Sequence, residues 1–265
     1  MPSLLAITRG VSAAFGRCEL THLPRVPIDV ARARAQHDAY ERALAGLGCH
    51  PQRLPAPADL PDAVFVEDTA IVLDELAVIT RPGAPSRRPE THAVADALRA
   101  WRPVRQIVEP ATIDGGDVLR IDRTLYVGRS TRTNEAGLEQ LQALVAPAGY
   151  AVRGIAVTGC LHLKSAVTCV APRTVLLNPE WVDPAAFAGC DGLEVHPDEP
   201  LGANALWVGP GLIYAAAFPR TRARLEQRGL DVRVVDVSEI AKAEGAVTCC
   251  SLIVGLPAPV PAARP

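Results

Sequence analysis

Three short segments of this chain carry side chains able to do chemistry together. They are Thr248-Cys249-Cys250-Ser251, Leu161-His162-Leu163-Lys164-Ser165 and Ile113-Asp114-Gly115-Gly116-Asp117. A thiol, an imidazole base and a carboxylate that orients the base are the groups of an activated cysteine nucleophile. Each segment alone also has a plain structural interpretation, as a buried cysteine, a core histidine or a turn aspartate. Their joint presence favours nucleophilic catalysis.

Two adjacent acids, Glu67 and Asp68, follow the apolar run Val64-Phe65-Val66. Buried carboxylates are costly without a cationic partner, and a guanidinium suits them because its planar donors match their oxygens. A solvated strand end is the alternative interpretation. Arg87 and Arg132 lie near polar turns, where they are either surface charges or groups that hold a substrate carboxylate.

Composition sets limits on the class of protein. The chain has 265 residues, of which 49% are hydrophobic, with 27 basic and 29 acidic side chains. This balance gives no basic patch for nucleic acid or an anionic membrane. No segment approaches the roughly 18 apolar residues of a membrane span. Seven cysteines without a Cys-x-x-Cys pair suit free thiols in the cytoplasm, and argue against a structural zinc site.

The elements that must position these groups are helices and hairpins in alternation. Helices are predicted over 29–47, with Asp29 as N-cap, and over 90–101, 134–145 and 220–228. Paired apolar runs around polar or Gly/Pro turns predict hairpins over 69–80, 117–127, 166–177 and 205–215, and a last strand over 247–254. Adjacent residues of a strand face opposite sides, so only one of Cys249 and Cys250 is expected to face a site.

The spacing of these hairpins suggests a repeat. Asp68 and Asp117 are 49 positions apart, Ala166 follows 49 further on, Asn204 after 38 more, and Cys249 after another 45. Periods of this length are typical of propellers and solenoids, and five units fill the chain. An ordinary α/β domain with irregular hairpins is the alternative. In a radial array, the polar groups at the start of each unit would meet at the central axis.

The motifs together resemble the dimethylarginine dimethylaminohydrolase family, part of the guanidino-modifying pentein superfamily. The resemblance lies in the three segments above and in segments 61–68, 79–88 and 132–134, and it runs from about residue 29 to the last strand. It implies an α/β fold, a five-bladed pseudo-symmetric ββαβ propeller. We expect one catalytic propeller domain over 1–256 and a Pro-rich tail over 257–265.

The resemblance also implies a role for each matching residue. Cys249 is similar to the family's nucleophile, His162 to its general acid and base, and Asp114 to the acid that orients the histidine. Asp68, with Glu67 beside it, is similar to the guanidinium-binding group, and Phe65 to a wall of the pocket. Asp62 matches the residue that receives the substrate α-amino group. Arg87 and Arg132 match those that hold the α-carboxylate. The segment around Cys18 to His22 is expected to form a lid.

The implied reaction is hydrolysis of Nω-methylated L-arginine, as asymmetric dimethylarginine or monomethylarginine, to L-citrulline and a methylamine through a covalent thiouronium on Cys249. The alternatives are arginine deiminase, which usually carries a helical insertion that this chain has no room for, an amidinotransferase, and a catalytically inactive guanidine-binding protein. No cofactor or catalytic metal is expected, although Zn²⁺ bound adventitiously by Cys249 and His162 would inhibit. The expected partner is the small-molecule substrate, with no nucleic acid or membrane, in a cytoplasmic monomer or homodimer.

Charge gives one more expectation. A pocket rich in carboxylates raises the pKa of a thiol, and a bound guanidinium lowers it. Cys249 is therefore predicted to be mostly neutral at rest and to become a thiolate when substrate binds.

Overall fold

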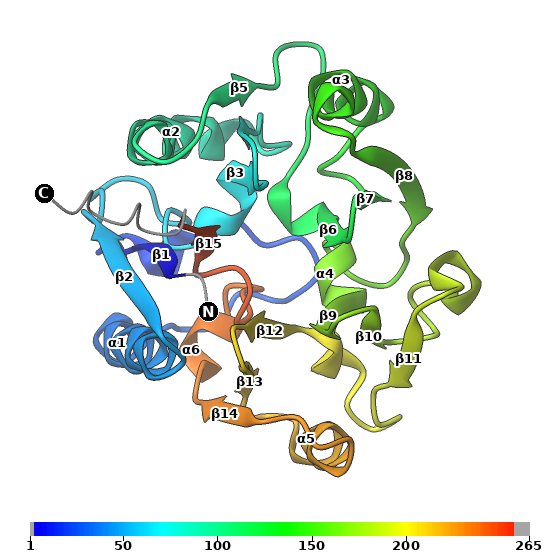
Figure 1. The fold of residues 1–265 in the computed structure, drawn as a ribbon. Coiled ribbons are helices and arrows are strands. Elements are labelled where there is room, and N and C mark those ends of the chain that lie inside the picture. The colour runs from blue at the N-terminus through cyan, green and yellow to red at the C-terminus, as the bar shows by residue number, and fades with distance from the viewer. Residues whose placement is uncertain (1–2, 257–265) are drawn as a thin grey trace, which may run out of the picture.

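Five three-stranded sheets form a ring around one axis in the computed structural model, which describes residues 3–256. Figure 1 shows β3, β6, β9, β12 and β15 nearest the centre and helices α1, α2, α3 and α5 on the rim. In each sheet the middle strand pairs antiparallel with the inner strand and parallel with the outer one. This arrangement confirms the predicted five-bladed ββαβ propeller. The predicted tail over 257–265 lies outside the described residues.

The blades follow one another along the chain, and the first is completed by both ends of it. Their strands, given as inner, middle and outer, are β15 (Leu252–Gly255), β1 (Leu4–Arg9) and β2 (Cys49–Leu54); β3 (Ala70–Val72), β4 (Ala77–Ile79) and β5 (Val104–Gln106); β6 (Val118–Ile121), β7 (Thr124–Arg129) and β8 (Ala151–Ala156); β9 (Val167–Ala171), β10 (Thr174–Leu177) and β11 (Asp191–Glu194); β12 (Ala205–Val208), β13 (Gly211–Ala215) and β14 (Val232–Val235).

A helix joins the middle strand to the outer strand in four of the five blades. These helices are α1 (Val30–Gly46), α2 (Thr91–Arg99), α3 (Glu135–Val145) and α5 (Pro219–Gln227). The blade of β9 to β11 has only the 3₁₀ turn η6 (Pro184–Phe187) at this place. All four predicted long helices are confirmed to within two residues at each end. Asp29 caps α1 as expected, since its side chain accepts a hydrogen bond from the Arg32 N–H.

The hydrophobic core lies between the blades. Helix α3 buries Leu138, Leu141 and Val145 at helical spacing, and α2 buries Val94 and Leu98 in the same way. The inner and middle strands are largely buried, whereas outer strands such as β2 and β11 are mostly exposed or half-buried. Over the described part of the chain, the helices are too short or too polar to cross a bilayer.

One predicted element is wrong at its start. The last strand does not cover 247–254, because β15 begins only at Leu252 and residues 247–250 form a turn. Glu67 donates its N–H to the Cys249 carbonyl, and Thr248 donates its N–H to the Asn204 side chain. These side-chain and loop contacts take the backbone groups that a longer strand would use for its ladder. The two cysteines therefore differ in direction because of a turn, not because of strand alternation.

Short turns precede the inner strands and carry most of the polar groups near the axis. They include the 3₁₀ turns η2 (Val66–Thr69), η4 (Gly115–Asp117) and η7 (Pro200–Ala203), and the single helical turn α4 (Leu163–Ala166). The remaining short elements are η1 (Phe15–Arg17), η3 (Pro85–Glu90), η5 (Ala146–Ala148) and α6 (Ser238–Ala241).

Candidate active site

A cavity of about 20 Å³ lies where the turns from several blades meet. Seven of the nine predicted site residues line it, and they are Asp62, Phe65, Asp68, Arg87, Arg132, His162 and Cys249. Asp114 is fully buried and contacts the His162 ring. Glu67 lines a different cavity, of about 370 Å³, between the inner strands. The radial fold thus brings together residues that are far apart in the sequence.

Cys249 lies in the turn before β15, with its sulfur toward the pocket. Its Sγ accepts a hydrogen bond from the Ala246 N–H at 3.3 Å. Cys250, in contrast, is fully buried in the core. Burial raises the pKa of the Cys249 thiol well above its usual range, and the nearby carboxylates of Glu67 and Asp68 raise it further. This upward shift of the Cys249 pKa agrees in direction with the prediction of a neutral resting thiol.

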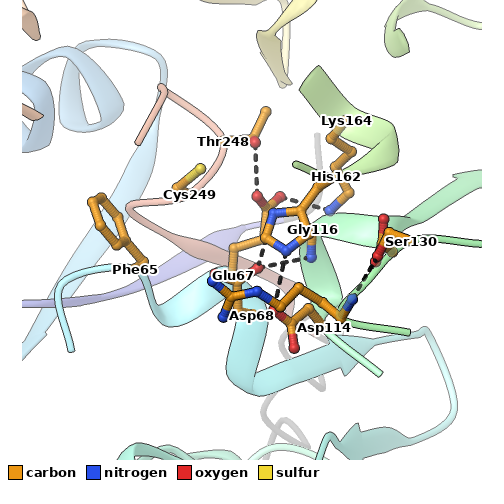
Figure 2. Close-up of polar contacts among 12 residues, drawn as sticks. Phe65, Glu67, Asp68, Asp114, Gly116, Ser130, His162, Lys164, Thr248 and Cys249 are labelled. Atoms are coloured by element: carbon orange, nitrogen blue, oxygen red, sulfur yellow. Dashed lines mark hydrogen bonds and ion pairs between the residues drawn. The ribbon is translucent and has the colours of Figure 1, made fainter. Parts of the chain in front are cut away.

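His162 lies between two carboxylates (Figure 2). Its Nε2 is 3.0 Å from Asp114 Oδ2, and its Nδ1 is 3.9 Å from Asp68 Oδ1. Burial lowers the pKa of the imidazole, but Asp68 and the hydrogen bond with Asp114 outweigh it and raise the pKa to about 9. The free site therefore holds an imidazolium at neutral pH, which is the form that can act as a general acid.

The Asp68 carboxylate is held in place by two hydrogen bonds. Its Oδ1 accepts a hydrogen bond from the Gly116 N–H at 3.0 Å, and its Oδ2 accepts one from Arg87 Nη1 at 2.6 Å. Burial tends to raise the pKa of this carboxyl, but His162 and Arg87 lower it to about 2. An anionic carboxylate beside the thiol suits a cationic guanidinium ligand.

Nearly all N–H groups of the Arg87 guanidinium donate hydrogen bonds to protein acceptors. Its Nε and Nη2 donate to the Glu90 carboxylate, and its Nη2 also donates to the carbonyls of Asp62 and Phe65. With one Nη1 hydrogen on Asp68, a second Nη1 hydrogen remains for a ligand. Glu90 is buried, which raises its pKa to about 7 although Arg87 lowers it.

A second network lies beneath the site on the axis. Glu67 accepts hydrogen bonds from Lys164 Nζ at 2.6 Å and from the Thr248 hydroxyl at 2.7 Å, and Asn204 donates to that same hydroxyl at 2.9 Å. Figure 2 shows Glu67 with its contacts to Lys164 and Thr248 beside His162. The network ties the segment of His162 to the segment of Cys249. Both Glu67 oxygens are therefore occupied, and its predicted contact with a guanidinium stays a prediction.

Residues 18–25, which we call the lid, lie against the outer end of the pocket. The Glu19 N–H donates to both oxygens of Asp62, at 3.0 and 3.2 Å. Arg132 Nη2 donates to the Thr21 hydroxyl at 3.0 Å. The lid thus contacts two of the residues that are predicted to hold the amino-acid end of a substrate.

Asp117 is a functional residue that the sequence motifs do not single out, and it positions His162 and Asp114. Its Oδ1 accepts the Leu163 N–H at 3.0 Å, next to His162. Its Oδ2 accepts the Thr133 hydroxyl, which in turn accepts the Asp114 N–H. A signal was present, because Asp117 follows Asp114 across the Gly-Gly step and starts an inner strand. Lys164 was also missed, although it lies two residues after His162.

The described residues contain a compact set of metal-binding atoms at the site. Asp68, Asp114 and His162 place one donor atom each within 4.8 Å of one another. This set does not include Cys249. The predicted inhibitory binding of zinc by Cys249 and His162 therefore stays a prediction.

Comparison with known proteins places this geometry in a family. The family model described as N,N dimethylarginine dimethylhydrolase, eukaryotic, matches residues 25–186. An N(G),N(G)-dimethylarginine dimethylaminohydrolase from Streptomyces coelicolor is 42% identical, over 95% of this chain and 97% of the relative.

Two solved structures agree with the fold. A dimethylarginine dimethylaminohydrolase bearing an adduct with S-methyl-L-thiocitrulline has a TM-score of 0.90 and 33% identity, covering 96% of this chain and all of the other. The Pseudomonas aeruginosa enzyme, as a cysteine-to-serine variant complexed with citrulline, has a TM-score of 0.88 and 32% identity, covering 94% and 98%. Since the sequence match and the fold match both span nearly the whole chain, this protein belongs to the dimethylarginine dimethylaminohydrolase family.

Proposed function

We propose that this protein hydrolyses Nω-methylated L-arginine to L-citrulline and a methylamine, with Cys249 as the nucleophile. The observation that carries the proposal is the shared cavity of Cys249, His162 and the ionised Asp68. A thiol and an imidazolium beside a carboxylate match a guanidinium carbon that must be attacked and an amine that must be protonated. The relatives bound to citrulline and to an S-methylthiocitrulline adduct support the same chemistry.

The first half of the reaction forms the covalent intermediate. Binding of the cationic guanidinium beside Asp68 lowers the pKa of the Cys249 thiol, which releases its proton to solvent. The thiolate attacks the guanidinium carbon and gives a neutral tetrahedral adduct. The His162 imidazolium then protonates the methylated nitrogen, the C–N bond breaks, and dimethylamine leaves a thiouronium cation on Cys249.

The second half restores the enzyme. His162, now neutral, takes a proton from water while the water oxygen attacks the thiouronium carbon. The C–S bond breaks, the hydroxyl proton passes to the departing sulfur, and citrulline leaves. His162 is again an imidazolium and Cys249 again a thiol. Asp114 holds the ring through the 3.0 Å contact at Nε2 in both halves.

The other proposed contacts hold the amino-acid end of the substrate. Asp62 receives the α-ammonium group, and Arg132 with the free Nη1 hydrogen of Arg87 receives the α-carboxylate. Phe65 forms a wall of the pocket. This proposal requires no cofactor and no metal. The proposed location is the cytoplasm, since all seven cysteines are unpaired. The proposed oligomeric state is a monomer or a homodimer.

The test is citrulline release from asymmetric dimethylarginine and from arginine, measured in parallel. We expect turnover of the methylated substrate, lost in Cys249→Ser and kept in the matched control Cys250→Ala, whose side chain is buried in the core. A preference for arginine would make the protein a deiminase. Binding without any release of citrulline would overturn the proposal and favour a guanidine-binding protein.

A further inference from the structure

We propose that Glu244 is a positioning residue that latches the lid over the catalytic pocket. Its carboxylate accepts hydrogen bonds from three consecutive backbone N–H groups of the lid, those of Thr21, His22 and Leu23, at 2.5 to 3.1 Å. Successive N–H groups that converge in this way form a concave anion site, here filled by a side chain from 221 to 223 residues away.

The backbone conformation at Glu244 indicates that its side chain has a function. Glu244 has φ of 59°, in the left-handed region that favours glycine or asparagine. The next residue, Gly245, has no room for a side chain, because an added Cβ would lie 2.2 Å from the Phe65 ring. The turn that carries the latch is therefore fixed against a wall of the pocket, five residues before Cys249. A strained glutamate in such a fixed place points to a function for its carboxylate.

The lid has other anchors, but two of them use groups that the substrate needs. The Glu19 N–H occupies Asp62, and the Thr21 hydroxyl occupies Arg132. When substrate binds, the substrate ammonium and carboxylate replace these two lid groups, an inference that rests on the proposed function. Glu244 also lines this cavity, but its carboxylate contacts lid N–H groups and not the residues proposed to bind the substrate. It can hold the lid while substrate is bound, together with the smaller contact from the Ser86 hydroxyl to the Glu19 carboxylate.

The size of the cavity shows why the latch must also open. The accessible volume of about 20 Å³ is little more than the roughly 10–15 Å³ that a single water molecule needs, so the closed pocket has too little space for an amino-acid substrate. Entry requires the lid to move away, and the three hydrogen bonds to Glu244 to break. The latch thus sets how often the free pocket is open, and how firmly it closes on the substrate.

The first experiment uses the free enzyme and needs no substrate. In Glu244→Gln a neutral oxygen replaces the carboxylate. We expect amide hydrogen exchange of residues 21–23, and alkylation of Cys249 by iodoacetamide, to become about tenfold faster, because hydrogen bonds to a charged acceptor are the stronger kind. The matched control is Glu226→Gln on α5, which removes an exposed carboxylate paired with Arg222, and both rates are expected to stay unchanged.

A second variant separates a latch from a merely structural residue. Glu244→Gly removes the carboxylate and also relieves the left-handed backbone. We expect the melting temperature to stay the same or rise while lid exchange and alkylation still become faster. A lower melting temperature with an unchanged lid would overturn the latch, as would unchanged exchange in both variants.

Kinetics connect the latch to the reaction. For asymmetric dimethylarginine we expect Glu244→Gln to raise KM about tenfold with little change in kcat, because the lost contact holds the lid rather than the reacting atoms. If the lid loosens but no methylated arginine is hydrolysed even by the unmutated protein, the latch stands and the proposed function fails. If turnover is normal and KM and lid exchange are unchanged in the variant, the proposed function stands and the latch fails.

Discussion

Asp114 and His162 form a buried pair in which Asp114 Oδ2 lies 3.0 Å from Nε2 of the ring. Together with Asp68 this contact outweighs burial and raises the pKa of His162 to about 9. The imidazolium is needed to protonate the leaving amine, so kcat/KM is expected to fall as the pH rises through about 9. Asp114→Asn weakens the pair and should move this fall to lower pH. The check is a pH profile of both proteins, and superimposable alkaline limbs would contradict it.

Gly116 lies against the catalytic groups and leaves no space for a methyl group. A Cβ there would lie 2.7 Å from His162 Nδ1 and 2.8 Å from Asp68 Oδ1. We expect Gly116→Ala to reduce kcat/KM by about 100-fold, because displaced catalytic groups lose much of their effect. Gly46→Ala is the matched control, since nothing lies within 4 Å of an added Cβ there. Equal activity of the two variants would refute this prediction.

Lys164 is the cation that balances the carboxylate of Glu67 beneath the site. In Lys164→Met that carboxylate keeps only the Thr248 hydroxyl as a partner. We expect the free energy of unfolding to drop by about 3 kcal/mol, because a buried charge is left without its counter-ion. Adding Glu67→Gln should recover part of the loss. Urea unfolding of the two single variants and the double variant measures the coupling, and strictly additive effects would argue against it.

Arg132 and Arg87 are both predicted to hold the substrate carboxylate, yet they differ in what else they support. Arg132→Ala should raise KM about tenfold or more, because the substrate carboxylate loses a charged partner. The melting temperature should stay nearly unchanged, because Arg132 donates to only one lid hydroxyl in the free protein. With an N-methylated guanidine that lacks the carboxylate, the variant should match the unmutated protein. A similar loss with both substrates would exclude this role.

Arg87 is buried between Asp68 and Glu90, and its loss should be structural as well. Arg87→Ala leaves two buried carboxylates without their cation, and we expect it to destabilise the fold by about 3–5 kcal/mol. Thermal and urea unfolding test this directly. A variant that unfolds like the parent while KM rises would show that the ion pairs contribute little.

The parts of the fold that the sequence predicts well are those with a strong local pattern. Helix 29–47 has a capping aspartate and a terminal glycine, and the hairpins have apolar runs around polar turns, so both appear where expected. Outer strands such as β2 and β11 have no such pattern. β2 reads Cys-His-Pro-Gln-Arg-Leu and β11 reads Asp-Gly-Leu-Glu. They exist because each can pair in parallel with a buried middle strand, which is a property of the ring and not of the segment.

The candidate site also contains residues that the sequence predicts and residues that it does not. Cys249, His162 and Asp114 are recognisable because each combines a reactive side chain with a distinctive neighbourhood. Glu244 has neither, as its role depends on a lid that comes from the other end of the chain. The local sequence also does not predict where the last strand begins, because residues 247–249 have strand-forming side chains. In the fold, Asn204 accepts the Thr248 N–H and Glu67 donates to the Cys249 carbonyl, so these backbone groups do not join the sheet. Such long-range hydrogen bonds leave no periodic trace in the sequence.

The pairing of β1 with β15 has a consequence for how activity first appears in a cell. The blade that carries the nucleophile is finished only when the N-terminal strand meets residues 252–255. The histidine and the acids belong to segments that are synthesised earlier, whereas the thiol lies just before the strand that completes the ring. Reactivity toward guanidines therefore depends on the segment that is synthesised late, and it arises only when β15 closes the ring against β1.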